Sequence, residues 1–268
     1  MKTNMILKSL TLFTVCALAF WALPAMAADT LTGAPEPWQL NMQTAGSPSA
    51  EHLHEFHNML LYIISGISLF VLLLLIYVVL RFNKRANPEP KQFSHNVMIE
   101  VIWTLVPVLI LIAIVVPSFK LLYFLDRTTE PDMTLKVTGY QWYWGYEYPD
   151  QDGINFLSYL VPEDELSSDQ KRLLSTDNPV VLPVDTNIQI LVSAADVLHS
   201  FAMPSLGIKT DAVPGRWNET WVKINKPGIY YGQCSELCGK DHAYMPIEIH
   251  AVSKEDFEAW AKKAKEEL

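Results

Sequence analysis

The chain has 268 residues, enough for one or two domains with hydrophobic cores, and half of its residues are hydrophobic. Its 29 acidic and 20 basic residues give a formal net charge of −9. This balance argues against a nucleic-acid-binding protein and suits a basic protein as partner. The hydrophobic residues concentrate in three blocks before residue 126, so we expect a membrane-inserted first part and a soluble second part.

The first hydrophobic block has the form of a secretory signal peptide. Two lysines precede an apolar run over residues 10–23, and the small-residue sequence ending at Ala27 fits the cleavage rule. The alternative is a permanent membrane anchor, for which the run is short. We predict that residues 1–27 are removed and that residues 28–57 form an extracytoplasmic N-terminal segment.

The second and third blocks predict a transmembrane helical hairpin over residues 58–125. Residues 59–80 and 101–122 are apolar runs long enough to cross a hydrocarbon core about 30 Å thick. Four basic residues and one acid lie between residues 81 and 91, so the positive-inside rule places this loop in the cytoplasm. A cleaved signal peptide agrees with that orientation, because it also puts both mature termini and the soluble domain outside.

Polar residues near the two spans have more than one interpretation. Glu100 stands at the start of the second span, where the helix dipole favours an acid, but a carboxylate there could also serve a proton path. His52, His54 and His57 precede the first span. Their spacing alone does not define a metal site, so we interpret them as solvated residues at the membrane surface.

After residue 126 the pattern of hydrophobic residues changes to a period of two. Alternating runs separated by turns rich in Gly, Pro, Asn and Asp occupy residues 133–140, 187–193, 219–224, 228–233 and 246–252. We therefore predict an all-β domain over residues 126–253, a Greek-key β-sandwich or barrel. Polar residues 162–178 read as a surface excursion without an assigned role, and residues 254–268 as a short amphipathic C-terminal helix.

Two cysteines, two histidines and a methionine form a candidate metal site. The stretch QCSELCGKDHAYMP has the spacing C-x3-C-x3-H-x2-M from Cys234 to Met245, and His199 supplies a second imidazole. Thiolates and thioethers are soft donors, and imidazole suits copper. This is the ligand set of a mononuclear blue-copper site with one additional cysteine. Two sulfurs could therefore bridge two coppers, each with one histidine, with Met245 axial on one and a backbone carbonyl of the cysteine loop axial on the other.

Other interpretations of these residues stay open at the level of spacing. The cysteines and histidines could form a zinc site, or Cys234 and Cys238 could form a disulfide. A copper-delivery or thiol-redox protein of thioredoxin type would need a helix to begin at the cysteines, but Gly239 and β-forming residues follow instead. Met203, four residues after His199, competes with Met245 as an axial ligand.

Four segments and the preceding hairpin carry a resemblance to a known family. The segments are VTGYQWYWGYEY, DVLHSF, PSLGIKTDAVPGRW and YYGQCSELCGKDHAYMP. The chain resembles cytochrome c oxidase subunit II over nearly its whole mature length. The resemblance implies a cupredoxin fold and a dinuclear Cu-A centre, and it favours Met245 over Met203. The implied copper ligands are His199, Cys234, Glu236 through its carbonyl, Cys238, His242 and Met245.

The resemblance also implies roles that spacing does not show. The side chain of Glu236 would bind magnesium or manganese shared with subunit I. Trp142 would be the point where electrons enter, although its aromatic run also suits a packed strand. Glu100 would lie at the mouth of a proton path. The acids implied to dock cytochrome c, otherwise read as a solvated acidic face, are Glu147, Asp177 and Asp196.

The implied function is that of a subunit of a bacterial inner-membrane cytochrome c oxidase. The chain would accept electrons from cytochrome c and pass them to the haem of subunit I, where oxygen is reduced to water with proton translocation. Expected partners are subunits I and III, cytochrome c and the bilayer, and no nucleic acid. The chain has no C-x-x-C-H motif for a fused cytochrome, so the donor is expected to be a separate protein. A quinol oxidase subunit would lack the copper ligands, and a nitrous oxide reductase would lack the paired spans.

Overall fold

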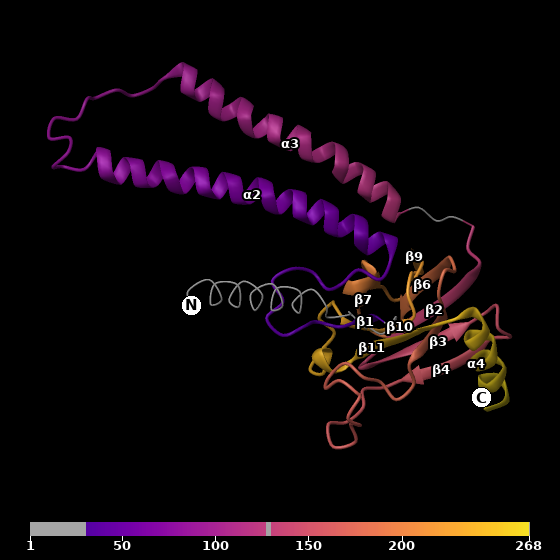
Figure 1. Ribbon diagram of the computed structural model, residues 1–268. Helices are drawn as coiled ribbons and strands as arrows, with labels where there is room; N and C mark the ends of the chain where they lie inside the picture. The colour runs from indigo at the N-terminus through magenta and orange to yellow at the C-terminus, as the bar shows by residue number, and fades with distance from the viewer. Residues whose placement is uncertain (1–30, 127–129, 268) are drawn as a thin grey trace, which may run out of the picture. The chain divides into compact units, whose positions relative to one another are not determined.

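A computed structural model describes residues 31–126 and 130–267 of the chain. The predicted signal peptide, residues 1–27, lies outside the described residues. A short strand, β1 (Leu31–Gly33), comes first, then two long helices, then the other strands of two β-sheets, then a C-terminal helix. This order confirms the predicted fold class, a helical hairpin followed by a β-sandwich domain with a short terminal helix (Figure 1).

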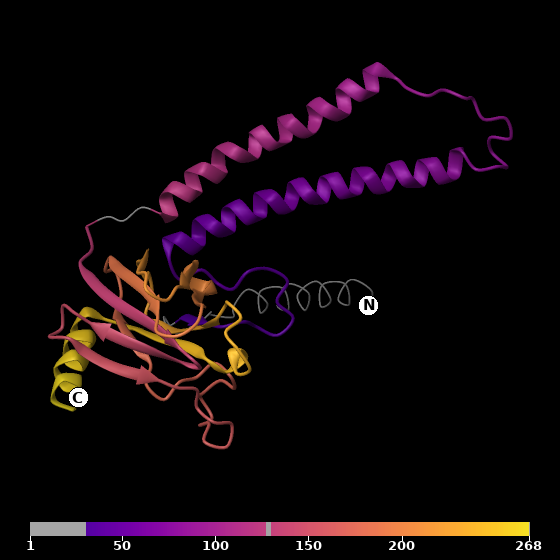
Figure 2. The same ribbon diagram turned by 180° about the vertical axis from the view of Figure 1, so that it is seen from behind.

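The hairpin consists of α2 (Pro48–Arg81) and α3 (Val97–Leu125), which run antiparallel to one another (Figure 2). Each begins after a residue whose side chain accepts a backbone hydrogen bond, because the first turn of a helix leaves N–H groups unpaired. Ser47 Oγ accepts from Ala50 N, and Asn96 Oδ1 accepts from Ile99 N. Both helices are long and apolar enough to cross a membrane and contain the predicted spans.

The β-domain packs two sheets face to face. The first has the order β5-β11-β10-β7-β8, with β1 paired to β10, and the second has the order β4-β3-β2-β6-β9. The strands of the first sheet are β1 (Leu31–Gly33), β5 (Val180–Pro183), β7 (His199–Met203), β8 (Ile208–Ala212), β10 (Gly228–Cys234) and β11 (Pro246–Val252). Those of the second are β2 (Met133–Tyr140), β3 (Tyr143–Tyr148), β4 (Ile154–Ser158), β6 (Ile188–Ala194) and β9 (Asn218–Val222).

The core lies between the sheets and follows from the alternation in sequence. Every second residue of β2 is buried, and β6 beside it begins with the same alternation. Trp144 and Tyr148 on β3 are fully buried, and the Tyr148 hydroxyl bonds both backbone groups of Val181 on β5, at 3.1 Å each. The Tyr148 hydroxyl thus joins the two sheets through the backbone N–H and carbonyl of Val181.

The predicted strand runs all correspond to strands, but they do not include β1, β3, β4, β5, β7 and β8. In β5 and β7 every residue is buried, so no alternation marks them. The C-terminal helix α4 (Lys254–Glu267) forms as predicted, and its Trp260 packs on Tyr148 with ring centroids 5.1 Å apart. The excursion at 162–178 is a series of turns, held to β11 where Thr176 N donates to Glu248 Oε2 at 2.7 Å.

Candidate metal centre

Three neighbouring segments bring the sulfur and imidazole donors together. β7 begins at His199, and β10 ends at Cys234, which lies opposite Phe201 of β7. The chain then loops through Cys238 into the short helix η2 (His242–Tyr244) and returns as β11. The pairing of β7 with β10 therefore carries a histidine distant in sequence to the cysteine loop.

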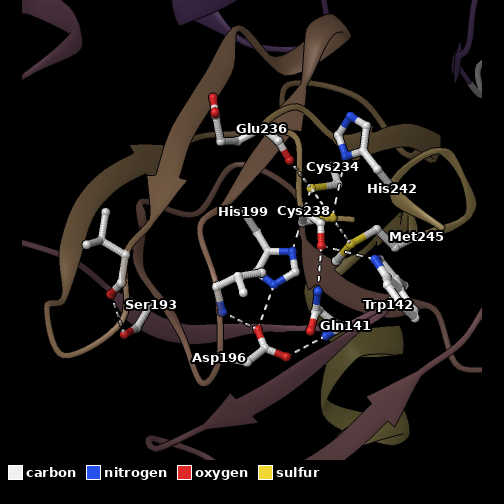
Figure 3. Close-up of polar contacts among 12 residues, drawn as sticks. Gln141, Trp142, Ser193, Asp196, His199, Cys234, Glu236, Cys238, His242 and Met245 are labelled. Carbon is white, nitrogen blue, oxygen red and sulfur yellow. Dashed lines mark hydrogen bonds and ion pairs between the residues drawn. The ribbon is translucent and has the colours of Figure 1, made fainter. Parts of the chain in front are cut away.

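The sulfur atoms form the centre of this cluster. Cys234 Sγ and Cys238 Sγ are 3.8 Å apart, and both cysteines are free (Figure 3). His199 Nδ1 lies 3.8 Å from Cys234 Sγ, and His242 Nδ1 lies 3.5 Å from Cys238 Sγ. Each thiol thus has its own imidazole, and in both histidines the same ring nitrogen faces sulfur.

Two weaker donors flank the sulfurs. Met245 Sδ lies 3.6 Å from Cys238 Sγ, and the carbonyl of Glu236 lies 3.3 Å from Cys234 Sγ. The Glu236 side chain is exposed and points away from the sulfurs, while its carbonyl points toward them (Figure 3). Met203, the competing candidate, is fully buried and packs its sulfur over Gly232 on β10.

Burial and mutual charge set the ionisation of the two thiols. Burial raises the pKa of the Cys238 thiol, and the adjacent Cys234 charge raises it further. Burial alone would also raise the pKa of Cys234, but hydrogen bonding, above all with His199, lowers it below the ordinary thiol value. Cys234 therefore loses its proton more readily than Cys238.

Asp196 fixes the orientation of His199, a role that sequence reasoning missed. Its Oδ1 lies 2.9 Å from His199 Nε2, and His199 is fully buried. With a metal bound, a proton on Nε2 shared with this carboxylate would leave the Nδ1 lone pair to the metal, the usual arrangement of a metal-binding histidine and its acidic partner. The D-x-x-H spacing was the available signal, but Asp196 was assigned only to partner docking.

Two residues on the turn between β2 and β3 contact the cysteine loop through their side chains. Trp142 Nε1 donates to the carbonyl of Cys238 at 3.2 Å, and Gln141 Nε2 donates to the same oxygen at 2.7 Å. The Trp142 ring is partly buried, with Lys240 Nζ 5.7 Å from its centre. Sequence reasoning singled out Trp142 but not Gln141, for which the sequence carries no metal-ligand signal.

Other predicted residues lie outside the cluster. Glu147 on β3 is paired with Lys136 at 2.9 Å, and the Asp177 carboxylate accepts from Tyr159 N and Asn178 N at 2.7 Å. Glu100 lies in the first turn of α3, where its Oε1 accepts from Asn96 N at 3.3 Å.

Side chains close enough together to share a metal ion are found at one place in the described part of the chain. Within residues 31–126 and 130–267, the group of three His, Cys, Asp or Glu side chains close enough to share an ion is His199, Cys234 and Cys238, with ligand atoms within 4.8 Å of one another. The interpretation of His52, His54 and His57 as solvated residues at the membrane surface stays a prediction.

Comparison with known proteins identifies the family. The family described as "Cytochrome C oxidase subunit II, periplasmic domain" matches residues 133–252, and its companion "Cytochrome C oxidase subunit II, transmembrane domain" matches residues 35–121. The chain belongs to the cytochrome c oxidase subunit II family. This membership and the two apolar helices make it a membrane protein.

Individual relatives agree with this assignment to subunit II. A probable cytochrome c oxidase subunit 2 of Rickettsia bellii is 54% identical over 226 residues, 84% of either chain. Cytochrome c oxidase subunit 2 of Oenothera berteroana is 47% identical over 236 residues, covering 86% of this chain and 92% of the relative. The crystal structure of the periplasmic domain of subunit II of cytochrome oxidase (CoxB) of Bradyrhizobium japonicum is 50% identical. It has a TM-score of 0.50 and covers 53% of this chain and 99% of that one.

Proposed function

We propose that this chain accepts electrons from cytochrome c at a dinuclear copper centre and passes them to the haem of subunit I. The observation that carries the proposal is the convergence of two buried thiols, each facing its own imidazole, with a thioether and a backbone carbonyl beside them. A copper pair bound there would supply one-electron redox chemistry with the charge spread over two metals.

The residues that would hold the two coppers form one chemically consistent set. Both thiols lose their protons when the metals bind, because a thiolate is the metal-binding form. The positive charge then offsets the repulsion that opposes double ionisation in the metal-free pair. The proposed ligands are His199, Cys234, the Glu236 carbonyl, Cys238, His242 and Met245.

The donor types favour copper over the alternatives. A structural zinc ion takes four strong ligands in a closed tetrahedral site, and has no use for a thioether and a carbonyl in addition. Thioether sulfur is a soft ligand that favours copper. Cys234 is the last residue of β10, and Cys238 lies in the loop that leads to η2. Neither cysteine stands at the start of an α-helix, which gives no support to a thioredoxin-type redox protein.

Electron uptake is proposed to occur at Trp142. Its indole N–H is bonded to the carbonyl of Cys238, and the carbonyl connects through Cα and Cβ to the sulfur. The ring is partly exposed, so a donor haem can approach it from outside. An acidic chain favours encounter with a basic cytochrome c, with Glu147, Asp177 and Asp196 as the proposed docking carboxylates.

The cysteine loop is proposed to face subunit I. Its exposed Glu236 carboxylate would hold the shared magnesium or manganese ion, and Leu237 beside it is 76% exposed, as suits a contact with a protein partner. Glu100 is proposed to open a proton path into subunit I. Oxygen reduction and proton translocation would occur in the assembled bacterial inner-membrane complex, with subunits I and III, and the β-domain on the periplasmic side.

The test is the rate at which the assembled oxidase takes electrons from reduced cytochrome c. Trp142→Phe removes the indole N–H but keeps an aromatic ring, so copper content should stay constant. We expect uptake to slow at least about tenfold, equivalent to about 1.4 kcal/mol in the barrier. Trp260→Phe on α4 serves as the matched control. An unchanged uptake rate in Trp142→Phe would refute the assigned route.

A further inference from the structure

The carbonyl of Cys238, in the cysteine loop, accepts hydrogen bonds from two side chains on the turn between β2 and β3. It accepts from Gln141 Nε2 at 2.7 Å and from Trp142 Nε1 at 3.2 Å. A carbonyl oxygen has two lone pairs, so these two donors fill its capacity. The hydrogen bond from Gln141 is the shorter of the two, so it contributes more to fixing the orientation of the carbonyl.

Gln141 is also attached to the histidine side of the cluster. Its backbone N–H donates to Asp196 Oδ2 at 2.7 Å, and Asp196 Oδ1 lies 2.9 Å from His199 Nε2. Figure 3 shows Gln141 between the cysteine loop and Asp196, bonded to both. A single residue on the turn between β2 and β3 thus ties the Cys238 carbonyl to the partner of His199.

The cysteine loop leaves space for this arrangement at Gly239. A Cβ atom at this position would lie 2.9 Å from Trp142 Cζ2 and 3.1 Å from Gln141 Nε2, closer than side chains normally approach. The φ angle of Gly239 is +127°, a conformation that favours glycine. The loop backbone is therefore shaped for close contact with these two side chains in particular.

We propose that Gln141 is a positioning residue for electron uptake, which holds the Cys238 carbonyl against the indole N–H of Trp142. This inference rests on the proposed function and deepens it. Electron transfer weakens exponentially with the gap between groups, so a loosened indole contact slows transfer even when the metal ligands are unchanged. The other contact on the ring, the exposed Lys240 ammonium at 5.7 Å, is a weak cation–π interaction and does not fix the N–H direction.

The substitution Gln141→Met separates positioning from folding. Methionine has a similar length but no amide donor, and Gln141 is exposed, so the hydrophobic core stays intact. The backbone bond to Asp196 remains, because only the side chain changes. In the assembled oxidase we expect electron uptake from reduced cytochrome c to slow about tenfold, the order of effect that a small misplacement of a reacting group produces. Copper content should equal that of the wild type.

A second readout does not depend on the metal. In the full-length, metal-free chain in detergent, labelled with ¹⁵N-tryptophan, the indole N–H resonance of Trp142 should shift or broaden in Gln141→Met. Trp142→Phe identifies that resonance. Gln189→Met on β6 is the matched control and should leave both readouts unchanged, because it removes an amide bonded to Glu219 Oε1 on the neighbouring strand β9.

The outcomes distinguish this inference from the proposed function. Wild-type uptake rates in Gln141→Met, or an unmoved Trp142 resonance, would overturn the role of Gln141 alone. Loss of copper in Gln141→Met would also overturn it, because Gln141 would then maintain the metal site itself. A wild-type oxidase that takes up no electrons from cytochrome c would overturn the proposed function and this inference together.

Discussion

At the scale of single residues, opposing effects set the pKa values of the two cysteine thiols in the metal centre. Burial and the neighbouring thiolate raise the pKa of Cys238, while hydrogen bonding with His199 lowers the pKa of Cys234 despite its burial. The Cys234 thiol therefore loses its proton more readily than the Cys238 thiol. Cys234 and Cys238 would both hold a metal as thiolates, so metal loading and deprotonation of both thiols should occur together.

Removing one of the two proposed sulfur ligands should disrupt the proposed copper centre. In Cys238→Ser the hydroxyl is a poor soft-metal ligand, and His242 and Met245 lose the sulfur that they contact. We expect loss of at least one copper and of the mixed-valence spectrum, measured by metal analysis and electron paramagnetic resonance. A two-copper spectrum retained in this variant would refute the ligand assignment.

Asp196 should affect copper affinity as well as docking. In Asp196→Ala, His199 Nε2 loses its partner, and loss of such a partner typically weakens metal binding about 10–100-fold. Competition with a copper chelator measures the affinity. The control Asp164→Ala removes an exposed acid from the 162–178 excursion. Equal copper affinity in the two variants would limit Asp196 to a surface role.

At the scale of elements, the site depends on how the sheets are joined. β7 brings His199 to the end of β10, and the hydroxyl of Tyr148 on β3 pairs with the backbone of Val181 on β5. The ligands are therefore held by a framework in which each sheet fixes the other.

Tyr148→Phe tests this connection. The variant leaves a buried backbone N–H and carbonyl without their partner, which should cost about 1–3 kcal/mol of unfolding free energy. Thermal unfolding of the full-length chain measures the effect, with Tyr159→Phe on a partly exposed ring as control. Equal unfolding temperatures in the two variants would show that the hydroxyl does not join the sheets.

How far the sequence predicts these elements depends on burial. β2 could be predicted because one face is buried and the other is not, whereas β7 is buried throughout and its residues lack alternation. The ligands from Cys234 to Met245 could be found because they lie within one short stretch. The link from Asp196 to His199 has a signal in the D-x-x-H spacing. The contacts of Gln141 could not be found, because turn geometry brings this residue to a cysteine loop 97 residues away and leaves no mark on spacing.

At the scale of the whole molecule, the charge pattern predicts an orientation. The loop between α2 and α3 carries the basic residues, so it should lie in the cytoplasm and the β-domain in the periplasm. A membrane-impermeant maleimide should label Gln92→Cys only in inside-out vesicles, and Asp164→Cys only in intact spheroplasts. The reverse labelling pattern would contradict the orientation.

The most direct test of the central claim is the copper content of the full-length chain together with its electron paramagnetic resonance spectrum. The account predicts two coppers per chain and a multi-line pattern of one unpaired electron shared between two copper nuclei. One copper, bound zinc, or a metal-free chain with a disulfide between Cys234 and Cys238 would contradict the dinuclear centre and, with it, the proposed route of electrons through this protein.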